Sequence, residues 1–236
     1  MQFQPSWDLS FAIGSFLGDG SFVEDSDYHH HVKLAVRGRD FAEAFNLAVG
    51  HVLGRKTNKL IITHDLGKVY YESKYSCRSL GLFLKLPLEQ LHPFMNEFPG
   101  AFLSGLFSAD GSASVSLRSF GLLTSIILTN SRVELLSMVD ELLRTYFDIH
   151  SRTYLNKRRG TTWKNGKKTV VLRKDSYNLC IIRRQDLKTF LGRIGFVIRR
   201  KQERAEKAMH LIETLGRSKA AEVWRLTSNA SSMAIA

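Results

Sequence analysis

Two stretches of this chain share one pattern and read Ser10-Phe11-Ala12-Ile13-Gly14-Ser15-Phe16-Leu17-Gly18-Asp19-Gly20 and Ala101-Phe102-Leu103-Ser104-Gly105-Leu106-Phe107-Ser108-Ala109-Asp110-Gly111. Their aspartates are 110 − 19 = 91 positions apart. Each stretch is apolar with a small residue at every fourth position, and residues four apart share one helix face. Glycine after the last helical residue is a common helix stop. The pattern predicts two helices whose backbones pack closely along small-residue stripes. The residues of this interface are Ser10, Gly14, Ala101 and Gly105.

The aspartates that end the two runs are candidates for a metal site. Parallel packing of the helices would bring the carboxylates of Asp19 and Asp110 together. Two neighbouring carboxylates resist joint ionisation unless a positive charge lies between them. Magnesium prefers carboxylate and carbonyl oxygens, and a helix C-terminus offers unpaired carbonyls. We therefore expect Asp19, Asp110 and the carbonyls of Gly18 and Ala109 as ligands. Such a site suits phosphodiester hydrolysis.

The second stretch resembles the motif of the LAGLIDADG homing endonucleases. The resemblance rests on Leu103, Gly105, Leu106, Ala109, Asp110 and Gly111. The first stretch matches more weakly, at Gly14, Asp19 and Gly20. The alternative interpretation is a pair of ordinary core helices that end in Asp-Gly turns.

The rest of the chain repeats in the same order, which supports an internal duplication. Asp40 with Glu43 has the spacing of a capping box, and Ser131 with Glu134 repeats it 131 − 40 = 91 positions later. Further along, the offset between the halves grows to 107, so the second half contains 107 − 91 = 16 extra residues, which we place between positions 157 and 174. A basic helix is predicted over residues 199–215, after a connecting stretch before the second motif that contains Pro87, Pro93 and Pro99.

The predicted fold class is α+β, with two αββαββα repeats. By resemblance to the family, the repeats join through their motif helices, and two four-stranded antiparallel sheets form a saddle over DNA. The predicted units are residues 1–98, residues 99–227 and a flexible tail at 228–236.

Charge and composition favour a polyanionic partner. The net charge of +12 and pI near 9.8 are typical of proteins that bind nucleic acid or an anionic membrane surface. Since no apolar run approaches the roughly 20 residues of a membrane span, we expect no membrane partner. The N-terminus lacks a signal-peptide pattern. The two distant cysteines, Cys77 and Cys180, argue against a disulfide scaffold. Together these features predict an intracellular protein.

Strand faces with alternating polar residues supply the candidate DNA contacts, because a two-stranded ribbon fits the major groove. The candidates are Ser21, His29, His31, Lys33, Arg37, Lys59, Tyr70, Lys74, Ser112, Ser114, Ser116, Arg118, Arg152, Tyr154, Asn156, Arg158, Lys167 and Arg173. A metal site at His29-His30-His31 is disfavoured, since successive strand residues point to opposite faces. The halves differ in these residues, which predicts an asymmetric target.

The resemblance implies a monomeric, intron-encoded endonuclease that cuts double-stranded DNA at a long site and leaves 3′ overhangs. It implies Mg²⁺ as cofactor, with Mn²⁺ substituting and Ca²⁺ binding without cleavage. Lys201 and Gln202 are expected beside the carboxylates, because the family places basic and water-ordering side chains there. Two alternatives stay open: an RNA maturase that assists intron splicing, and a DNA-binding regulator of the same fold that has lost cleavage.

Overall fold

The computed structural model describes residues 3–26, 29–65, 67–165 and 168–233. The first half contains α1 (Trp7–Asp19), β1 (Gly20–Ser26), β2 (His29–Val36), α2 (Arg39–Val52), β3 (Ile61–Asp65), β4 (Lys68–Ser76), α3 (Arg78–Leu84) and α4 (Leu88–Glu97). The second half contains α5 (Pro99–Asp110), β5 (Gly111–Arg118), β6 (Gly121–Asn130), α6 (Val133–Phe147), β7 (Arg152–Lys157), β8 (Thr162–Asn165), β9 (Lys168–Val171), β10 (Ser176–Ile181), α7 (Arg184–Arg193) and α8 (Arg199–Met233).

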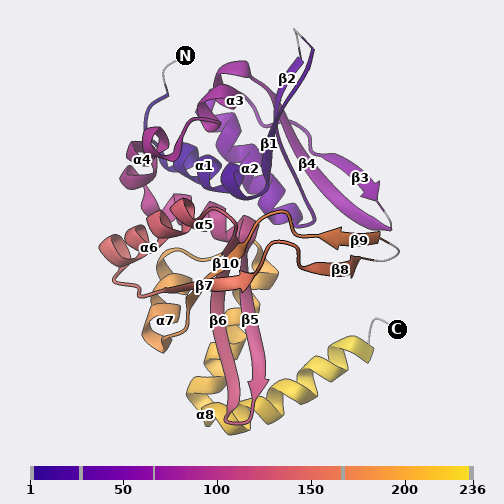
Figure 1. Cartoon of the computed structure of the whole chain (residues 1–236), viewed down its shortest axis with the longest axis vertical. Coiled ribbons are helices and arrows are strands. Elements are labelled where there is room, and N and C mark those ends of the chain that lie inside the picture. Colours follow the sequence, from indigo (N-terminus) through magenta and orange to yellow (C-terminus); the bar gives the residue numbers. More distant parts are fainter. Residues whose placement is uncertain (1–2, 27–28, 66, 166–167, 234–236) are drawn as a thin grey trace.

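The two halves have the same sheet topology. The first sheet has the strand order β1-β2-β4-β3 and the second has β5-β6-β10-β7, with antiparallel pairing throughout. Figure 1 shows α1 and α5 side by side between the two sheets. The predicted α+β fold with two αββαββα repeats is therefore confirmed.

Small residues let α1 and α5 approach until their backbones touch. A Cβ atom added to Gly14 would lie 2.1 Å from the carbonyl oxygen of Phe102, and one added to Gly105 would lie 2.5 Å from that of Phe11. Ser10 Oγ donates a hydrogen bond of 3.0 Å to the carbonyl of Phe98. These contacts run in the same order along both helices, so the helices are parallel, as the stripe pattern predicts.

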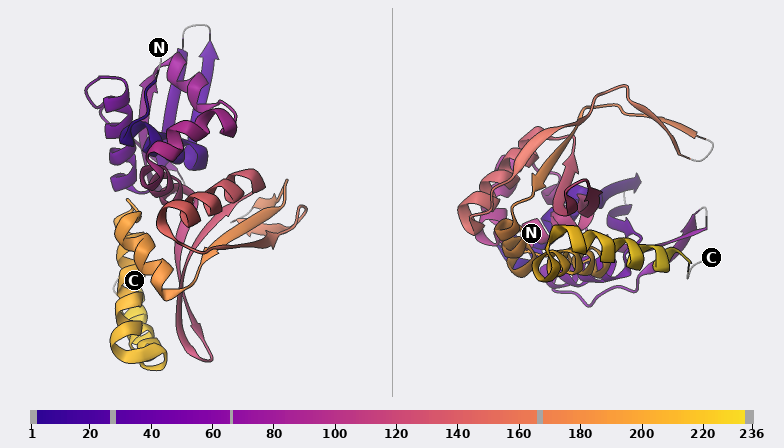
Figure 2. Two further views of the ribbon diagram at one scale, coloured as in Figure 1. Left: turned by 90° about the vertical axis from the view of Figure 1, so that its left-hand side faces the viewer. Right: turned by 90° about the horizontal axis from the view of Figure 1, so that it is seen from below.

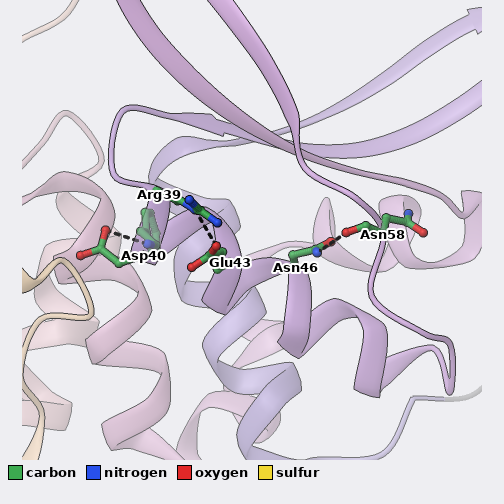
Figure 3. A network of polar contacts seen from close by, with 6 residues as sticks. Arg39, Asp40, Glu43, Asn46 and Asn58 are labelled. Carbon is green, nitrogen blue, oxygen red and sulfur yellow. Dashed lines mark hydrogen bonds and ion pairs between the residues drawn. The ribbon is translucent and has the colours of Figure 1, made fainter.

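The start of α2 differs from the sequence-based expectation (Figure 3). The helix begins at Arg39, and its N-cap, Gly38, has no side chain to cap it. Asp40 Oδ1 accepts from the amide of Phe41 at 2.9 Å, while Glu43 Oε1 accepts from Arg39 Nε at 2.7 Å. The predicted capping box is wrong because Glu43 pairs with an arginine of its own helix.

The start of α6, the corresponding helix of the second half, also differs from the sequence-based expectation. Its N-cap is Arg132, without a side-chain hydrogen bond to the helix, so the box predicted at Ser131 and Glu134 is also wrong. Asn130 Oδ1 accepts instead from the amide of Arg132 at 2.9 Å, which orders the turn before the helix.

Three segments break the symmetry of the repeats. The connecting stretch contains α4, a helix that accommodates Pro93 within it. The extra residues of the second half form the β8–β9 hairpin, at the predicted place. The helix α8 continues beyond the predicted end at Leu215, but Gly216 (φ 73°, ψ 164°) bends it sharply. We call the segment after the bend, residues 217–233, the C-terminal arm.

A small second core lies under the tip of the β5–β6 hairpin. Leu122 of β6 packs against Ala208 and Ile212 from before the bend and Ala220 and Ala221 from after it. The bend thus lets both parts of α8 cover one hairpin, seen at the lower end of the molecule in Figure 1 and in the left view of Figure 2. No helix in the described ranges is both long enough and apolar enough to cross a membrane.

Candidate functional site

The two motif helices end at the same place, so their aspartates are neighbours. A Cβ atom added to Gly18 would lie 2.3 Å from Ala109 Cβ and 3.5 Å from the carboxyl carbon of Asp110. Gly18 directly precedes Asp19 at the end of α1. Small residues at this position are therefore what lets the two helix ends, and with them the two carboxylates, come together.

Lys201, near the start of α8, reaches the end of α5. Its Nζ donates to the carbonyls of Ser108 at 2.6 Å, Gly111 at 2.6 Å and Ala109 at 3.3 Å. A cation at a helix C-terminus satisfies unpaired carbonyls and the negative end of the helix dipole. The structure thus brings the predicted Lys201 to the acidic pair, where it also contacts Ala109, one of the predicted ligands.

The charges of these three side chains are coupled. Loss of solvent raises the pKa of Asp19, while the charge of Lys201 lowers it. Burial and then the charge of Asp19 raise the pKa of Asp110 to about 6. Burial lowers the pKa of Lys201 to about 8, against the opposing effect of the two aspartates. Burial thus shifts all three groups towards their uncharged forms, and the attraction between the lysine and the two acids opposes this shift.

The two aspartates have different surroundings. Asp110 Oδ2 accepts a hydrogen bond of 2.8 Å from Asn130 Nδ2, a residue that sequence reasoning missed. Among the described residues, no hydrogen-bond donor reaches the carboxylate of Asp19. Asn130 ends the strand that pairs with the strand after α5, and this register places its amide beside Asp110.

These donors fit a hard divalent cation. The candidate ligands are two neighbouring carboxylates beside the carbonyl ends of two helices, and hard divalent cations prefer such oxygen ligands. The carboxylate of Asp19 accepts no hydrogen bond from the described residues. In the described part of the chain, no group of three or more His, Cys, Asp or Glu side chains could hold a metal ion. Backbone carbonyls such as those of Gly18 and Ala109 would therefore have to complete the ligand set.

The structure does not place Gln202 at the acidic pair. Its Oε1 accepts from the amide of Phe196 at 2.9 Å, and its Nε2 donates to Leu191 and Glu206. The side chain orders the loop before α8, and its hydrogen bonds in the described part of the chain go to this loop and to Glu206 rather than to the aspartates. In the first half, Lys85 lies 4.8 Å from the ring centroid of Phe22, so it supplies no counterpart of Lys201 there.

Asp40 of the first half holds the helix that carries Lys201. Its Oδ2 accepts a hydrogen bond of 2.7 Å from the amide of Arg199, the first residue of α8. On the other side of the same loop, Val197 donates to Ser108 Oγ at 2.8 Å. The segment before Lys201 is thus attached to both halves of the molecule.

We expect Asp40→Ala to slow the chemistry of the acidic pair by about tenfold or more, because a misplaced Lys201 no longer faces the carboxylates correctly. Asp40→Asn, which keeps an acceptor oxygen, should retain most activity. Under the endonuclease hypothesis from the sequence, the measurement is the cleavage rate at saturating protein together with duplex affinity. Equal rates for the two variants would contradict this positioning role.

The open face of the first sheet contains most of its predicted contact residues. Alternate positions of β2 and β4 are buried, and the intervening side chains face away from the core. Ser21, His31, Lys33, Tyr70 and Lys74 lie on this open face. Lys33 Nζ is 3.3 Å from Glu72 Oε2, so its charge is partly neutralised. Arg37 and Lys59 are exposed in loops next to β2 and β3.

The second sheet has an open face rich in serine. Its predicted residues in described strands are Ser112, Ser114, Ser116, Arg118, Arg152, Tyr154 and Asn156. Tyr154 Oη lies 3.3 Å from the sulfur of Cys180, an unpaired cysteine like Cys77. Arg158 and Arg173 flank the β8–β9 hairpin, while Lys167 and the side chain of His29 lie outside the described residues. The open face of the second sheet also includes Ser125, which pairs with Ser114 and was not among the predicted contact residues.

The raised pKa of Asp110 predicts a pH-dependent cost to folding. An acid whose pKa rises from 3.8 to about 6 binds its proton more tightly when folded, so stability falls as pH rises through that range. In metal-free buffer at pH 7, Asp110→Asn should raise the unfolding free energy by up to about 3 kcal/mol. Chemical denaturation at pH 4 and pH 7 measures this. A variant no more stable than the wild type at pH 7 would contradict it.

Comparison with known proteins finds one family model and one related protein that match this sequence. Residues 97–195 match the family model described as a LAGLIDADG-like domain. An uncharacterized protein of Methanocaldococcus jannaschii is 25% identical over 210 residues, which are 89% of this chain and 74% of that protein.

Three solved structures share the fold. I-DmoI in complex with DNA and Ca is 18% identical at a TM-score of 0.55, with 80% of this chain and 88% of that one covered. The homing endonuclease I-WcaI bound to its DNA recognition sequence is 14% identical at a TM-score of 0.55 (86% and 88%). Full-length DUF199/WhiA from Thermatoga maritima is 17% identical at a TM-score of 0.52 (98% and 69%). Residues 97–195 thus match a LAGLIDADG-like domain, and the chain has the single-chain, two-repeat fold of the LAGLIDADG homing endonucleases.

Proposed function

We propose that this protein is a metal-dependent endonuclease that cuts double-stranded DNA at a long, asymmetric site. The observation that supports this most is the juxtaposition of Asp19 and Asp110 with Lys201 at the shared end of α1 and α5. A protein that only bound DNA would gain nothing from two adjacent carboxylates, since the charge of Asp19 helps to raise the pKa of Asp110.

Each part of the site has a separate task in this proposal. Asp19, Asp110 and the carbonyls of Gly18 and Ala109 would hold Mg²⁺ or Mn²⁺, which when bound supplies a nucleophilic water and offsets charge on the leaving oxygen. Lys201 offsets negative charge that develops on the phosphate. Asn130 holds the Asp110 carboxylate in place through its amide. I-DmoI structures with Ca and with Mn support the choice of a divalent cation.

Duplex DNA is the partner that fits the surface. Two open sheet faces flank the acidic site, and the chain has a net charge of +12. I-DmoI and I-WcaI, which share the fold, are described in complex with DNA. We propose that this chain likewise acts as a monomer, with cuts that leave 3′ overhangs.

Cleavage of a randomised duplex library, followed by sequencing of survivors and products, tests the proposal. With Mg²⁺ we expect depletion of one asymmetric sequence family and products with 3′ overhangs. Binding of the recovered duplex should weaken steeply with salt, since cationic side chains replace condensed counterions. An intact library together with selective duplex binding would point to the regulator alternative. Selective binding of a structured intron RNA would point to the maturase alternative.

A further inference from the structure

Four arginine side chains line one cavity of about 380 Å³ beside the second sheet. They are Arg152, Arg183, Arg184 and Arg217. Within the described part of the chain, none of their guanidinium groups forms an ion pair with a carboxylate. Of the four, Arg184 interacts electrostatically with Glu213, which is itself paired with Lys188. Like charges gathered in one cavity repel one another, so binding of an anion among them lowers their free energy.

The cavity forms where three parts of the chain meet. The start of β7, the junction of β10 with α7, and the bend in α8 each contribute to its wall. A Cβ atom added to Gly121 in the β5–β6 turn would lie 2.5 Å from the backbone of Arg217. This contact fixes Arg217, the first residue after the bend at Gly216, against the hairpin. The guanidinium group of Arg217 lies 5.8 Å from the ring centroid of Phe120.

A buried hydroxyl group without a partner lies next to this cavity, on the side of the second sheet that α8 covers. A small adjoining cavity of about 20 Å³ shares Ile182, Arg184 and Arg217 with the arginine cavity. The hydroxyl of Thr124 in its wall is buried, with the residue 3% exposed, and has no hydrogen-bond partner. Buried hydroxyl groups are nearly always paired, so this one indicates a missing water or ligand oxygen.

We infer that the arginine cavity binds a phosphate group. Arginine binds phosphate through two parallel N–H donors. The first turn of α7 already contains the buried Asp186, whose carboxylate accepts from the amide of His150 in the cavity wall, so the arginines rather than this helix N-terminus would hold the phosphate. Arg152 lies on the open face of the second sheet, opposite Cys180. Since that face is the proposed DNA surface, a backbone phosphate of the bound duplex is the expected occupant. This assignment rests on the proposed function, whereas a phosphate site as such does not.

The test compares Arg184→Gln/Arg217→Gln with the control Arg144→Gln/Arg193→Gln, which removes the same charge from α6 and α7 away from the cavity. Affinity for the cognate duplex is measured in Ca²⁺ over a range of salt concentrations. A lost phosphate contact should make the plot of log affinity against log salt less steep by about one unit per contact in the cavity variant alone. Thermal unfolding without DNA is then measured in inorganic phosphate and in chloride of equal ionic strength.

Each outcome separates the possible occupants. A shallower salt slope in the cavity variant supports a backbone phosphate. An unchanged slope, with phosphate-specific stabilisation that the cavity variant loses, overturns the DNA assignment in favour of a free phosphate. Equal behaviour of both variants in both measurements overturns the phosphate site. Failure of the proposed function looks different, because the wild-type protein itself would then leave the duplex library uncut in Mg²⁺, whether or not it binds a duplex selectively.

Discussion

Replacement of either aspartate by asparagine should abolish DNA cleavage while duplex binding survives. Asp19→Asn and Asp110→Asn each remove one of two adjacent anionic ligands, and a metal ion contributes several kcal/mol to stabilising the transition state. The expected loss is roughly a thousand-fold or more in cleavage rate. Single-turnover cleavage with Mg²⁺, beside a binding assay in Ca²⁺, measures both properties.

The control for this prediction is Asp148→Asn, which changes the same charge at an exposed residue after α6. It should cut at the wild-type rate. Unchanged cleavage by Asp19→Asn or Asp110→Asn would refute the metal assignment. Loss of binding together with cleavage would show instead that the carboxylates shape the protein rather than act in the reaction.

Gly14→Ala should destabilise the protein strongly. The new methyl group would lie 2.1 Å from the carbonyl oxygen of Phe102, in the backbone of the partner helix, where no side chain can move aside. Overpacking of this kind forces backbone shifts, and we expect a loss of at least about 3 kcal/mol in unfolding free energy. Chemical denaturation monitored by circular dichroism measures the change.

The matched control is Gly192→Ala in α7. A Cβ atom there meets no heavy atom within 4 Å, so the substitution should be neutral or raise stability by up to about 1 kcal/mol through helix propensity. A folded Gly14→Ala protein with wild-type stability would contradict the close backbone contact between α1 and α5.

The duplicated architecture was predictable because its determinants are local and repeated. Small residues four apart, Asp-Gly helix ends and alternating strands recur in both halves, and each pattern predicts its element directly. The C-terminal arm was not predictable, because the chain bends at a single glycine, Gly216. The residue after it, Arg217, packs against Gly121 of a hairpin that is distant in the sequence. The prolines around α4 likewise concealed a helix, because Pro93 is tolerated inside it.

The two aspartates of the site were predictable because the repeated motif supplies them, whereas Lys201 was expected only from the family resemblance. Asp19, Asp110 and Lys201 lie together, and the roles proposed for them remain predictions. Asp40 was interpreted as a helix cap, but it binds the amide of Arg199, 159 positions away, which no local pattern indicates. The interaction between Asn130 and Asp110 likewise depends on strand register.

The contact between α1 and α5 has a consequence for how such a protein can change. Backbone atoms, rather than adjustable side chains, set the separation of the two helix ends. Substitutions on the outer strands therefore leave the spacing of the acidic groups unchanged. New sequence preferences can thus arise on the strands without a change in the distance between the two proposed cuts.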